Sequence, residues 1–315
     1  MYREQLISQS TKKDLEDFIF QIPAERRSFI NEIGKEILYK SIPLAKKRNN
    51  NQAEFFKSVE SIIMSKINQF SQKYQNLFRR SIIAKLALGL PKIVEQKGLP
   101  DSILVLYPKA FDRLSNHLKN NVNDPYELSD DFFRKDISFV SGISIPCGAQ
   151  VVDPKSYFLY RSVGRAFLRS GNLKALGRFF RIGGTGPWFG IHTESRYLDD
   201  FNEPGWDACY LRIADLLERN PSIRGMKGTS WFYDPQLISI SPHLSYLQKR
   251  PLERGAFMIR HGTNSVDIEL STLTSKTRRS LYKEGKYIPV SYTLLWPRRD
   301  LISWAESYRS KNKKG

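Results

Sequence analysis

The stretch that decides the fold runs from Trp206 to Pro235 and reads WDACYLRIADLLERNPSIRGMKGTSWFYDP. Its first part, Trp206 to Arg219, carries apolar residues at helical spacing. Its second part, Gly225 to Tyr233, is strand-like and is ended by Asp234-Pro235. A second helix and another strand, Gly255 to Arg260, follow. Strands that alternate with helices of this length predict a sheet with crossover helices, and such sheets place ligand sites at strand ends.

The helix predicted over Trp206 to Arg219 is amphipathic. Its apolar residues recur at i, i+4, i+7 and i+8, so we expect them to be buried against the sheet: Cys209, Ile213, Leu216 and Leu217. The charged residues on the other side are expected towards solvent: Asp207, Arg212, Asp215 and Arg219.

Working outward, the chain before about residue 98 reads as helical, with segments expected at Asp14 to Phe20, Ala24 to Tyr39, Phe55 to Phe70 and Gln75 to Leu88. The helical pattern ends near three helix-breaking residues: Pro91, Gly98 and Pro100. After residue 100 the hydrophobic pattern includes strand-like runs. Strands are expected at Ser102 to Tyr107, Ile137 to Ile145, Ala149 to Val152 and Ile288 to Trp296, and helices at Phe111 to Lys119 and Asp300 to Tyr308. The sequence therefore predicts a mixed α/β (α+β) protein. A helical N-terminal region (1–100) would precede an α/β domain (101–315) with a central, mostly antiparallel sheet flanked by helices.

Composition narrows the class of protein. The 315 residues are 40% hydrophobic and 12% aromatic, which is typical of a globular chain that buries a core. No apolar run approaches the roughly 20 residues that span a bilayer, and the first residues lack the apolar core of a signal peptide, so a cytoplasmic location is expected. The two cysteines, Cys147 and Cys209, form no C-x-x-C pair. The net charge of +18 predicts attraction to a phosphate-bearing ligand, nucleic acid or an acidic membrane surface.

A glycine-rich turn, Arg181-Ile-Gly-Gly-Thr-Gly186, precedes the decisive stretch. The backbone N–H groups of Gly183, Gly184 and Gly186 could form a nest for phosphate, with Arg181 adding charge. The string Arg181-x-x-Gly184-x-Gly186 resembles the R/Q-x-x-G-x-G/A loop of the GNAT superfamily of N-acyltransferases, and the order of elements over roughly residues 100–300 resembles that fold. One departure is that Pro187 to Ile191 looks extended, where the family's loop opens directly into a helix. If the turn is not the pyrophosphate loop, the segment carrying Arg196 would take its place.

The resemblance implies an acyltransferase that moves an acyl group from acyl-CoA, or from an acyl carrier protein, to the amine of a small molecule or protein. Acyl-CoA would be a co-substrate, with no tightly bound cofactor and no metal. His192 or Glu194 would take the proton from the amine. Tyr233 would protonate the leaving thiolate, and backbone N–H groups near Gly225 to Ser230 would polarise the carbonyl.

The segment Thr229-Ser-Trp-Phe-Tyr-Asp234-Pro supplies the proton-donor candidates Tyr233 and Ser230 at a strand end. Alternation along the strand would place Ser230, Phe232 and Asp234 on one face and Trp231 and Tyr233 on the other. The alternative is a structural role, with a buried Trp231 and with Asp234 capping a following helix.

A second interpretation treats His192, Glu194 and His243 as ligands of a mononuclear non-haem iron, since two histidines and one carboxylate are the facial-triad donor set. Arg254 then resembles the oxoacid-binding arginine of 2-oxoglutarate-dependent oxygenases. This enzyme class is the alternative to the acyltransferase.

A third interpretation needs no enzyme. Basic residues mix with tyrosines late in the chain, a pattern that suits binding of nucleic acid or anionic membrane: Arg278, Arg279, Lys283, Lys286, Arg298 and Arg299, with Tyr282, Tyr287 and Tyr292. The same pattern occurs on ordinary solvated surfaces, and no recognised nucleic-acid module is present.

Overall fold

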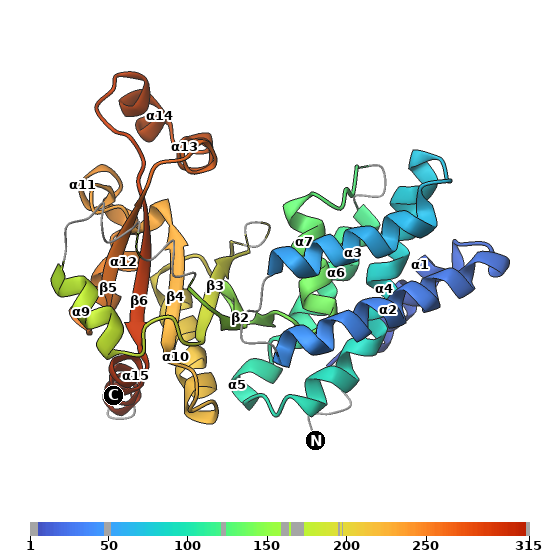
Figure 1. Ribbon diagram of the computed structural model, residues 1–315, viewed down its shortest axis with the longest axis horizontal. Coiled ribbons are helices and arrows are strands. Elements are labelled where there is room, and N and C mark those ends of the chain that lie inside the picture. The colour runs from blue at the N-terminus through green and yellow to red at the C-terminus, as the bar shows by residue number, and fades with distance from the viewer. Residues whose placement is uncertain are drawn as a thin grey trace. The chain divides into compact units, whose positions relative to one another are not determined.

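The computed structural model describes residues 6–46, 52–120, 124–158, 164, 173–194, 196 and 198–312. The chain forms two compact units, Met1–Cys147 and Gly148–Gly315 (Figure 1). Among the described helices, none is long and apolar enough to cross a membrane.

The first unit is helical. Its elements are α1 (Gln9–Phe20), the 3-10 turn η2 (Ala24–Arg26), α2 (Arg27–Lys46), α3 (Gln52–Ile67), α4 (Gln72–Gln96), α5 (Asp101–Leu104), α6 (Tyr107–Asn120) and α7 (Asp131–Val140), with the two-residue strand β1 (Ile145–Pro146) at its end. Helix α4 is central, because α1, α2, α3, α6 and α7 all pack against it. The four helices predicted before residue 98 and the helix predicted over Phe111 to Lys119 are confirmed.

Two strands predicted in this region are wrong: the first is helical, and the second is helical up to Val140 and a strand only from Ile145. Ser102 to Tyr107 belongs to α5 and the start of α6, where Ile103, Tyr107 and Phe111 are buried at a spacing of four residues. Ile137 to Ile145 begins inside α7, which Asp130 caps by accepting a hydrogen bond from the Phe132 N–H at 3.0 Å. In both places a short apolar run resembled a strand, but burial follows the helical period. The first unit extends to Cys147, so α5, α6 and α7 belong to it.

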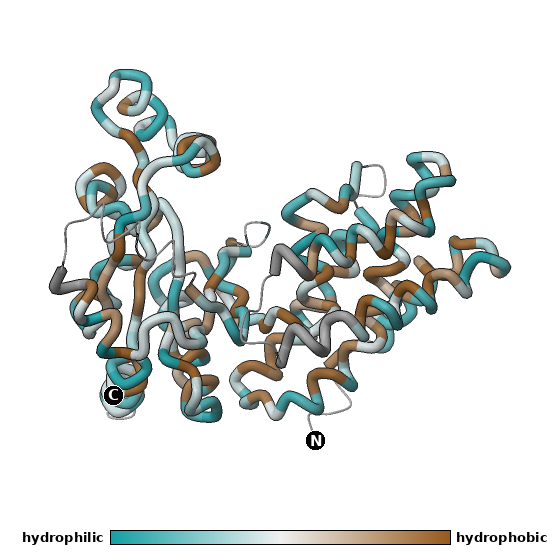
Figure 2. The backbone as a smooth tube through the Cα atoms, in the orientation of Figure 1, coloured by the Kyte–Doolittle hydropathy of each residue, from teal (hydrophilic) through white to brown (hydrophobic). Residues whose placement is uncertain are grey.

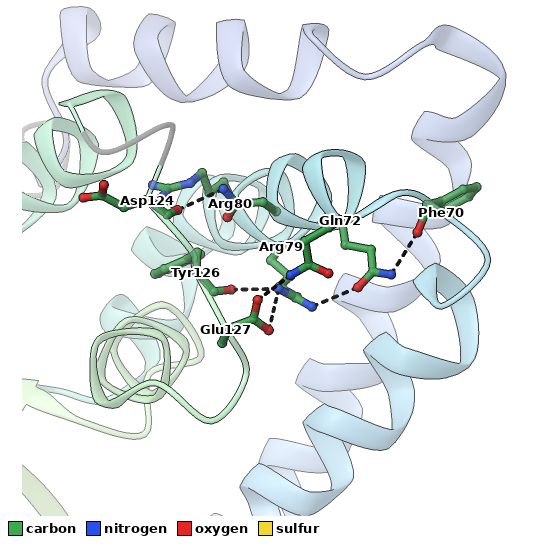
Figure 3. A network of polar contacts seen from close by, with 9 residues as sticks. Phe70, Gln72, Arg79, Arg80, Asp124, Tyr126 and Glu127 are labelled. Atoms are coloured by element: carbon green, nitrogen blue, oxygen red, sulfur yellow. Dashed lines mark hydrogen bonds and ion pairs between the residues drawn. The ribbon is translucent and has the colours of Figure 1, made fainter.

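Two arginines of α4 lie inside the first unit. Arg79 and Arg80 are only 2% and 1% exposed. Arg79 pairs with Glu127 at 2.9 Å and donates to the Tyr126 carbonyl, while Arg80 donates to the Asp124 carbonyl at 3.1 Å (Figure 3). Burial lowers the pKa of Arg80. Part of the chain's positive charge therefore fastens the 124–127 segment to α4 and is not displayed on the surface.

The second unit is built on a mixed sheet with helices on both faces. Its elements are β2 (Gln150–Ser156), α9 (Leu173–Arg181), β3 (Trp188–Thr193), α10 (Glu203–Arg219), β4 (Gly225–Ser230), η3 (Trp231–Tyr233), α11 (Leu237–Ile240), η4 (Pro242–Leu244), α12 (Tyr246–Glu253), β5 (Phe257–Gly262), α13 (Ser265–Leu273), α14 (Lys276–Lys283), β6 (Ser291–Pro297) and α15 (Arg298–Asn312). The strand order is β2-β3-β4-β6-β5, and every neighbouring pair is antiparallel except β3 and β4. The predicted mixed α/β class with a mostly antiparallel sheet is confirmed.

Helix α10 makes the crossover that a parallel pair needs, because it returns the chain from the end of β3 to the start of β4. Its apolar positions are buried as predicted, with Cys209, Ile213 and Leu217 fully so and Leu216 at 1%. Tyr210 of α10 meets Trp296 of β6, and Trp296 meets Trp304 of α15, so these two helices cover one face. The opposite face carries α9, whose Phe179 joins a cluster with Trp188, Phe257, Ile259 and Leu295.

One charged residue of α10 contradicts the prediction. Asp207 is only 5% exposed, because it pairs with Arg250 of α12 at 3.2 Å. Desolvation raises the pKa of this carboxyl. Periodicity placed Asp207 on the polar side of the helix, but it could not show that a second helix would cover that side.

Candidate active site

Strands β3 and β4 are paired over only part of their length. They pair at Phe189 with Met226 and at Gly190 with Lys227, and the register goes no further. The outer ladders do continue, since β2 pairs with β3 up to Thr193 and β4 pairs with β6 up to Ser230. The pairing of β3 with β4 therefore ends before the carboxyl ends of the two strands, although the Ile191 side chain still lies against Gly228. We call this unpaired end of the two strands the strand gap, bounded by residues 191–193 and 228–230.

A histidine and a buried carboxylate lie beside the strand gap. His192 on β3 bonds through Nε2 to Asp153 Oδ2 on β2 at 2.8 Å. Asp153 is 7% exposed at its side chain, whereas His192 is 51% exposed. A buried carboxylate that holds one imidazole nitrogen fixes the ring's orientation while the ring stays accessible. This pair can accept a proton from a molecule that enters from solvent.

Lys227 lies on the same face of the sheet at the last paired position. Gly190 is opposite both Asp153 and Lys227, so these two side chains share a face with His192. The Lys227 ammonium donates to the Tyr157 carbonyl at 2.8 Å and lies 4.0 Å from the centre of the Phe158 ring. Desolvation lowers the pKa of Lys227 to about 8, although the negative charge of Asp153 acts in the other direction. At neutral pH most of this amine still carries its proton, but it loses that proton at a lower pH than an ordinary lysine does.

Hydroxyl groups and a second histidine extend this polar row across the sheet. Thr229 and Thr293 are joined through their hydroxyls at 2.6 Å, and His261 Nε2 lies 2.6 Å from Thr293 Oγ1. Desolvation lowers the pKa of His261, and the nearby positive charge of Lys227 lowers it further. The row thus brings polar side chains from five strands to one face: Asp153, His192, Lys227, Thr229, Thr293 and His261.

Replacing Lys227 by methionine should change how stability depends on pH. The folded pKa of about 8 lies below the ordinary 10.5, so between these values the unfolded chain binds a proton that the folded chain does not. Unfolding free energy must then rise with pH across this window. We expect the wild type to gain up to about 3 kcal/mol relative to Lys227→Met between pH 8 and 10.5, at ~1.36 kcal/mol for each pKa unit. Urea titrations at several pH values measure it. The control is Lys249→Met, at an exposed lysine of α12. The prediction is contradicted if the difference in unfolding free energy between the wild type and Lys227→Met is as independent of pH as the difference for Lys249→Met.

Tyr233 approaches the strand gap from the other face. The predicted strand Gly225 to Tyr233 in fact ends at Ser230, and Tyr233 lies in the 3-10 turn η3. A Cβ built on Gly228 would lie 2.9 Å from the Tyr233 hydroxyl and 2.7 Å from the Ile191 side chain. Since Gly228 follows Lys227, its Cβ direction points away from the face of His192. Burial raises the pKa of Tyr233, so its hydroxyl keeps its proton at neutral pH.

The other two predicted catalytic residues have local partners. Glu194 lies just beyond β3 and forms a double contact with Arg196, at 3.0 Å to Nε and 2.8 Å to Nη2. The Arg196 guanidinium therefore neutralises much of the charge of this carboxylate. The Ser230 hydroxyl accepts the Phe232 N–H at 3.1 Å, which starts the 3-10 turn and ends the predicted alternation.

The glycine turn closes a helix. Gly183 N–H donates to the Phe180 carbonyl and Gly184 N–H to the Phe179 carbonyl, the pattern of a helix C-terminal cap with Gly183 at φ +104°. Gly186 N–H donates to the Gly183 carbonyl at 3.1 Å. The three amides proposed as a phosphate nest thus have acceptors inside the turn. Arg181 is exposed at the end of α9, but the turn adjoins the Trp188 end of β3, away from the open end of the strand gap.

The iron interpretation finds no ligand cluster in the described residues. His243 is exposed on η4, while His192 and Glu194 bind Asp153 and Arg196 respectively. Across the parts of the chain that the structure describes, there is no group of three His, Cys, Asp or Glu residues placed to hold a metal.

Several residues of the polar row were missed from the sequence: Asp153, Lys227, His261 and Thr293. A signal did exist in the strand predicted from Gly225, where a lysine stands between Met226 and Gly228. A lysine inside a central strand is unusual unless it has partners. The partners themselves come from β2, β5 and β6, which no local pattern links to β4.

Comparison with known proteins gives limited similarity. No protein-family model matches the chain, and no curated protein matches it. Among solved structures, an acyltransferase in complex with decanoyl-CoA is 12% identical, with a TM-score of 0.49 and coverage of 90% of this chain and 86% of that one. An acyltransferase in complex with CoA and 10C-teicoplanin is 11% identical, with a TM-score of 0.45 and 78% of each chain covered. Similarity at this level does not assign a function.

Proposed function

We propose that this protein transfers an acyl group from a coenzyme A thioester to an amine. The observation that carries the proposal is the strand gap together with the His192–Asp153 pair at its side. Strands that stop pairing in mid-sheet leave backbone edges that an extended ligand can join, as an added strand would. The pantetheine arm of coenzyme A is such a ligand, because it is a flexible chain with two amide groups. The chain's net charge of +18 favours a co-substrate that carries phosphates.

In this mechanism the acceptor amine attacks the thioester carbonyl on the face of the sheet that carries His192. His192 takes the proton from the attacking nitrogen, and Asp153 holds the ring in place. The carbon–nitrogen bond forms, the carbon–sulfur bond breaks, and the thiolate takes a proton from the Tyr233 hydroxyl. Solvent then returns a proton to Tyr233 and removes one from His192. Glu194 is a less suitable base than His192, since its carboxylate is engaged by Arg196.

The activity is tested by following thiol release from acetyl-CoA and decanoyl-CoA with a panel of primary amines, and by calorimetry with coenzyme A. We expect coenzyme A binding, and thiol release that depends on the amine. A parallel series with acyl-pantetheine, which lacks the nucleotide, separates acyl-CoA from carrier-protein donors: equal rates with both donors would favour a carrier protein. The proposal fails if the protein binds no coenzyme A and cleaves neither donor.

A further inference from the structure

The helix α13 displays apolar side chains to solvent. Val266, Leu270 and Leu273 are 59%, 52% and 59% exposed. They stand at i, i+4 and i+7, so they form one stripe along the helix. The helix nevertheless has a fixed inner side, where Ser271 is fully buried. An ordinary monomer surface scatters single exposed apolar residues, whereas a continuous stripe marks a site of interaction.

Basic residues lie next to this stripe on α14. Lys276, Arg279 and Lys283 recur at i, i+3 and i+7 and are all exposed. The Arg279 Nε donates to the Thr272 carbonyl at 3.2 Å, at the end of α13, which brings the basic row to the end of the apolar stripe. Tyr282 and Ile288 add exposed apolar surface nearby in sequence. Helices α13 and α14 form the connection between β5 and β6 and extend beyond the sheet, with hydrophobic segments visible along α13 (Figures 1 and 2).

The two helices are fastened to the body of the second unit. Arg278 is 5% exposed and donates to the Ser271 carbonyl at 2.6 Å and to the Ser241 hydroxyl at 2.9 Å. Its guanidinium also lies 4.8 Å from the centre of the Trp231 ring. The stripe and the basic row are therefore held in place before any ligand arrives.

We propose that α13 and α14 together dock on an anionic phospholipid surface. The apolar stripe would enter the boundary between headgroups and acyl chains, and the lysines would meet lipid phosphates. Nucleic acid would use the basic row but would leave the valine and leucine side chains in water, so the charge and the apolar stripe together favour lipid. Three acidic residues lie on or beside these helices: Asp267, Glu269 and Glu284. Asp267 accepts a hydrogen bond from the Ser291 hydroxyl at 2.6 Å and Glu284 is paired with Lys286 at 2.7 Å, so the exposed basic residues outnumber the exposed acidic ones. This inference does not depend on the acyltransferase proposal.

Vesicle flotation of the full chain tests it, with phosphatidylcholine vesicles and with vesicles that contain phosphatidylglycerol. We expect binding that needs the anionic lipid and weakens with salt. The double variant Leu270→Asp, Leu273→Asp should bind at least tenfold more weakly. The double variant Lys276→Glu, Lys283→Glu should lose at least roughly 30-fold, because each of the two lost positive charges contributes ~1 kcal/mol near an anionic surface and the glutamates add repulsion.

The matched control is Lys85→Glu with Lys249→Glu, which makes the same change in net charge at exposed lysines of α4 and α12. It should keep most of the binding, and circular dichroism melts should show all three variants folded. The proposal is overturned if the control loses as much binding as the α14 variant, if both vesicle types bind equally, or if no vesicle binds. Binding of single-stranded DNA that the α14 variant abolishes, without vesicle binding, would also overturn it in favour of nucleic acid.

Discussion

Replacing His192 by asparagine is expected to lower the rate of amine-dependent thiol release by ~100- to 10,000-fold, the range of general acid–base catalysis. The side chain is 51% exposed, so the substitution should leave the fold intact. His243→Asn, at an exposed histidine of the same unit, is the matched control.

Asp153 is expected to act through His192, which a double-variant comparison reveals. Asp153→Asn alone should slow the reaction by ~10- to 100-fold, because the ring loses its partner at 2.8 Å. Added to His192→Asn, it should cost little more, since residues that act as a unit are not additive. If the two effects simply multiply, Asp153 has a separate role. If His192→Asn keeps the wild-type rate, the base is misassigned.

Gly225→Ala is expected to lower the unfolding free energy of the second unit by at least ~4 kcal/mol. Few single substitutions cost this much, and those at strained backbone positions are among them. Gly225 has φ +148° where β4 begins beside Pro297 of β6. A Cβ there would overlap the carbonyl oxygen of Trp296 and lie 2.8 Å from the Arg298 nitrogen. Both are backbone atoms of the neighbouring chain segment, so neither can turn aside as a side chain could.

Gly285→Ala provides the comparison, because Gly285 has φ +68° and nothing lies within 4 Å of its built Cβ. It should cost only ~1–2 kcal/mol, the penalty of a left-handed residue. Urea unfolding of both variants measures the difference. Similar losses at the two positions would show that conformation alone matters and that the contact with β6 does not.

The elements with strong periodicity were predictable because local patterns decide them. Helix α10 has its apolar residues at i, i+4, i+7 and i+8, and these bury as expected. Short apolar runs were not predictable in the same way, since the run at Ile103 fits a strand or a helix until its neighbours in space are known. The turn at Gly183 shows the same limit, because a glycine can cap a helix as readily as it can bind phosphate.

In the candidate site, too, some features were predictable from the sequence and others were not. The sequence by itself determined the mixed α/β class, the crossover helix between β3 and β4, and His192 and Tyr233 as candidates near the ends of those strands. Only the tertiary structure decided that β3 and β4 stop pairing after Gly190 and Lys227, and that Asp153 is a partner of His192. The physical reason is that periodicity is a local property: it shows which face a residue occupies on its own helix or strand. Hydrogen bonds and desolvation depend on the neighbouring strands, and these come from distant segments of the chain.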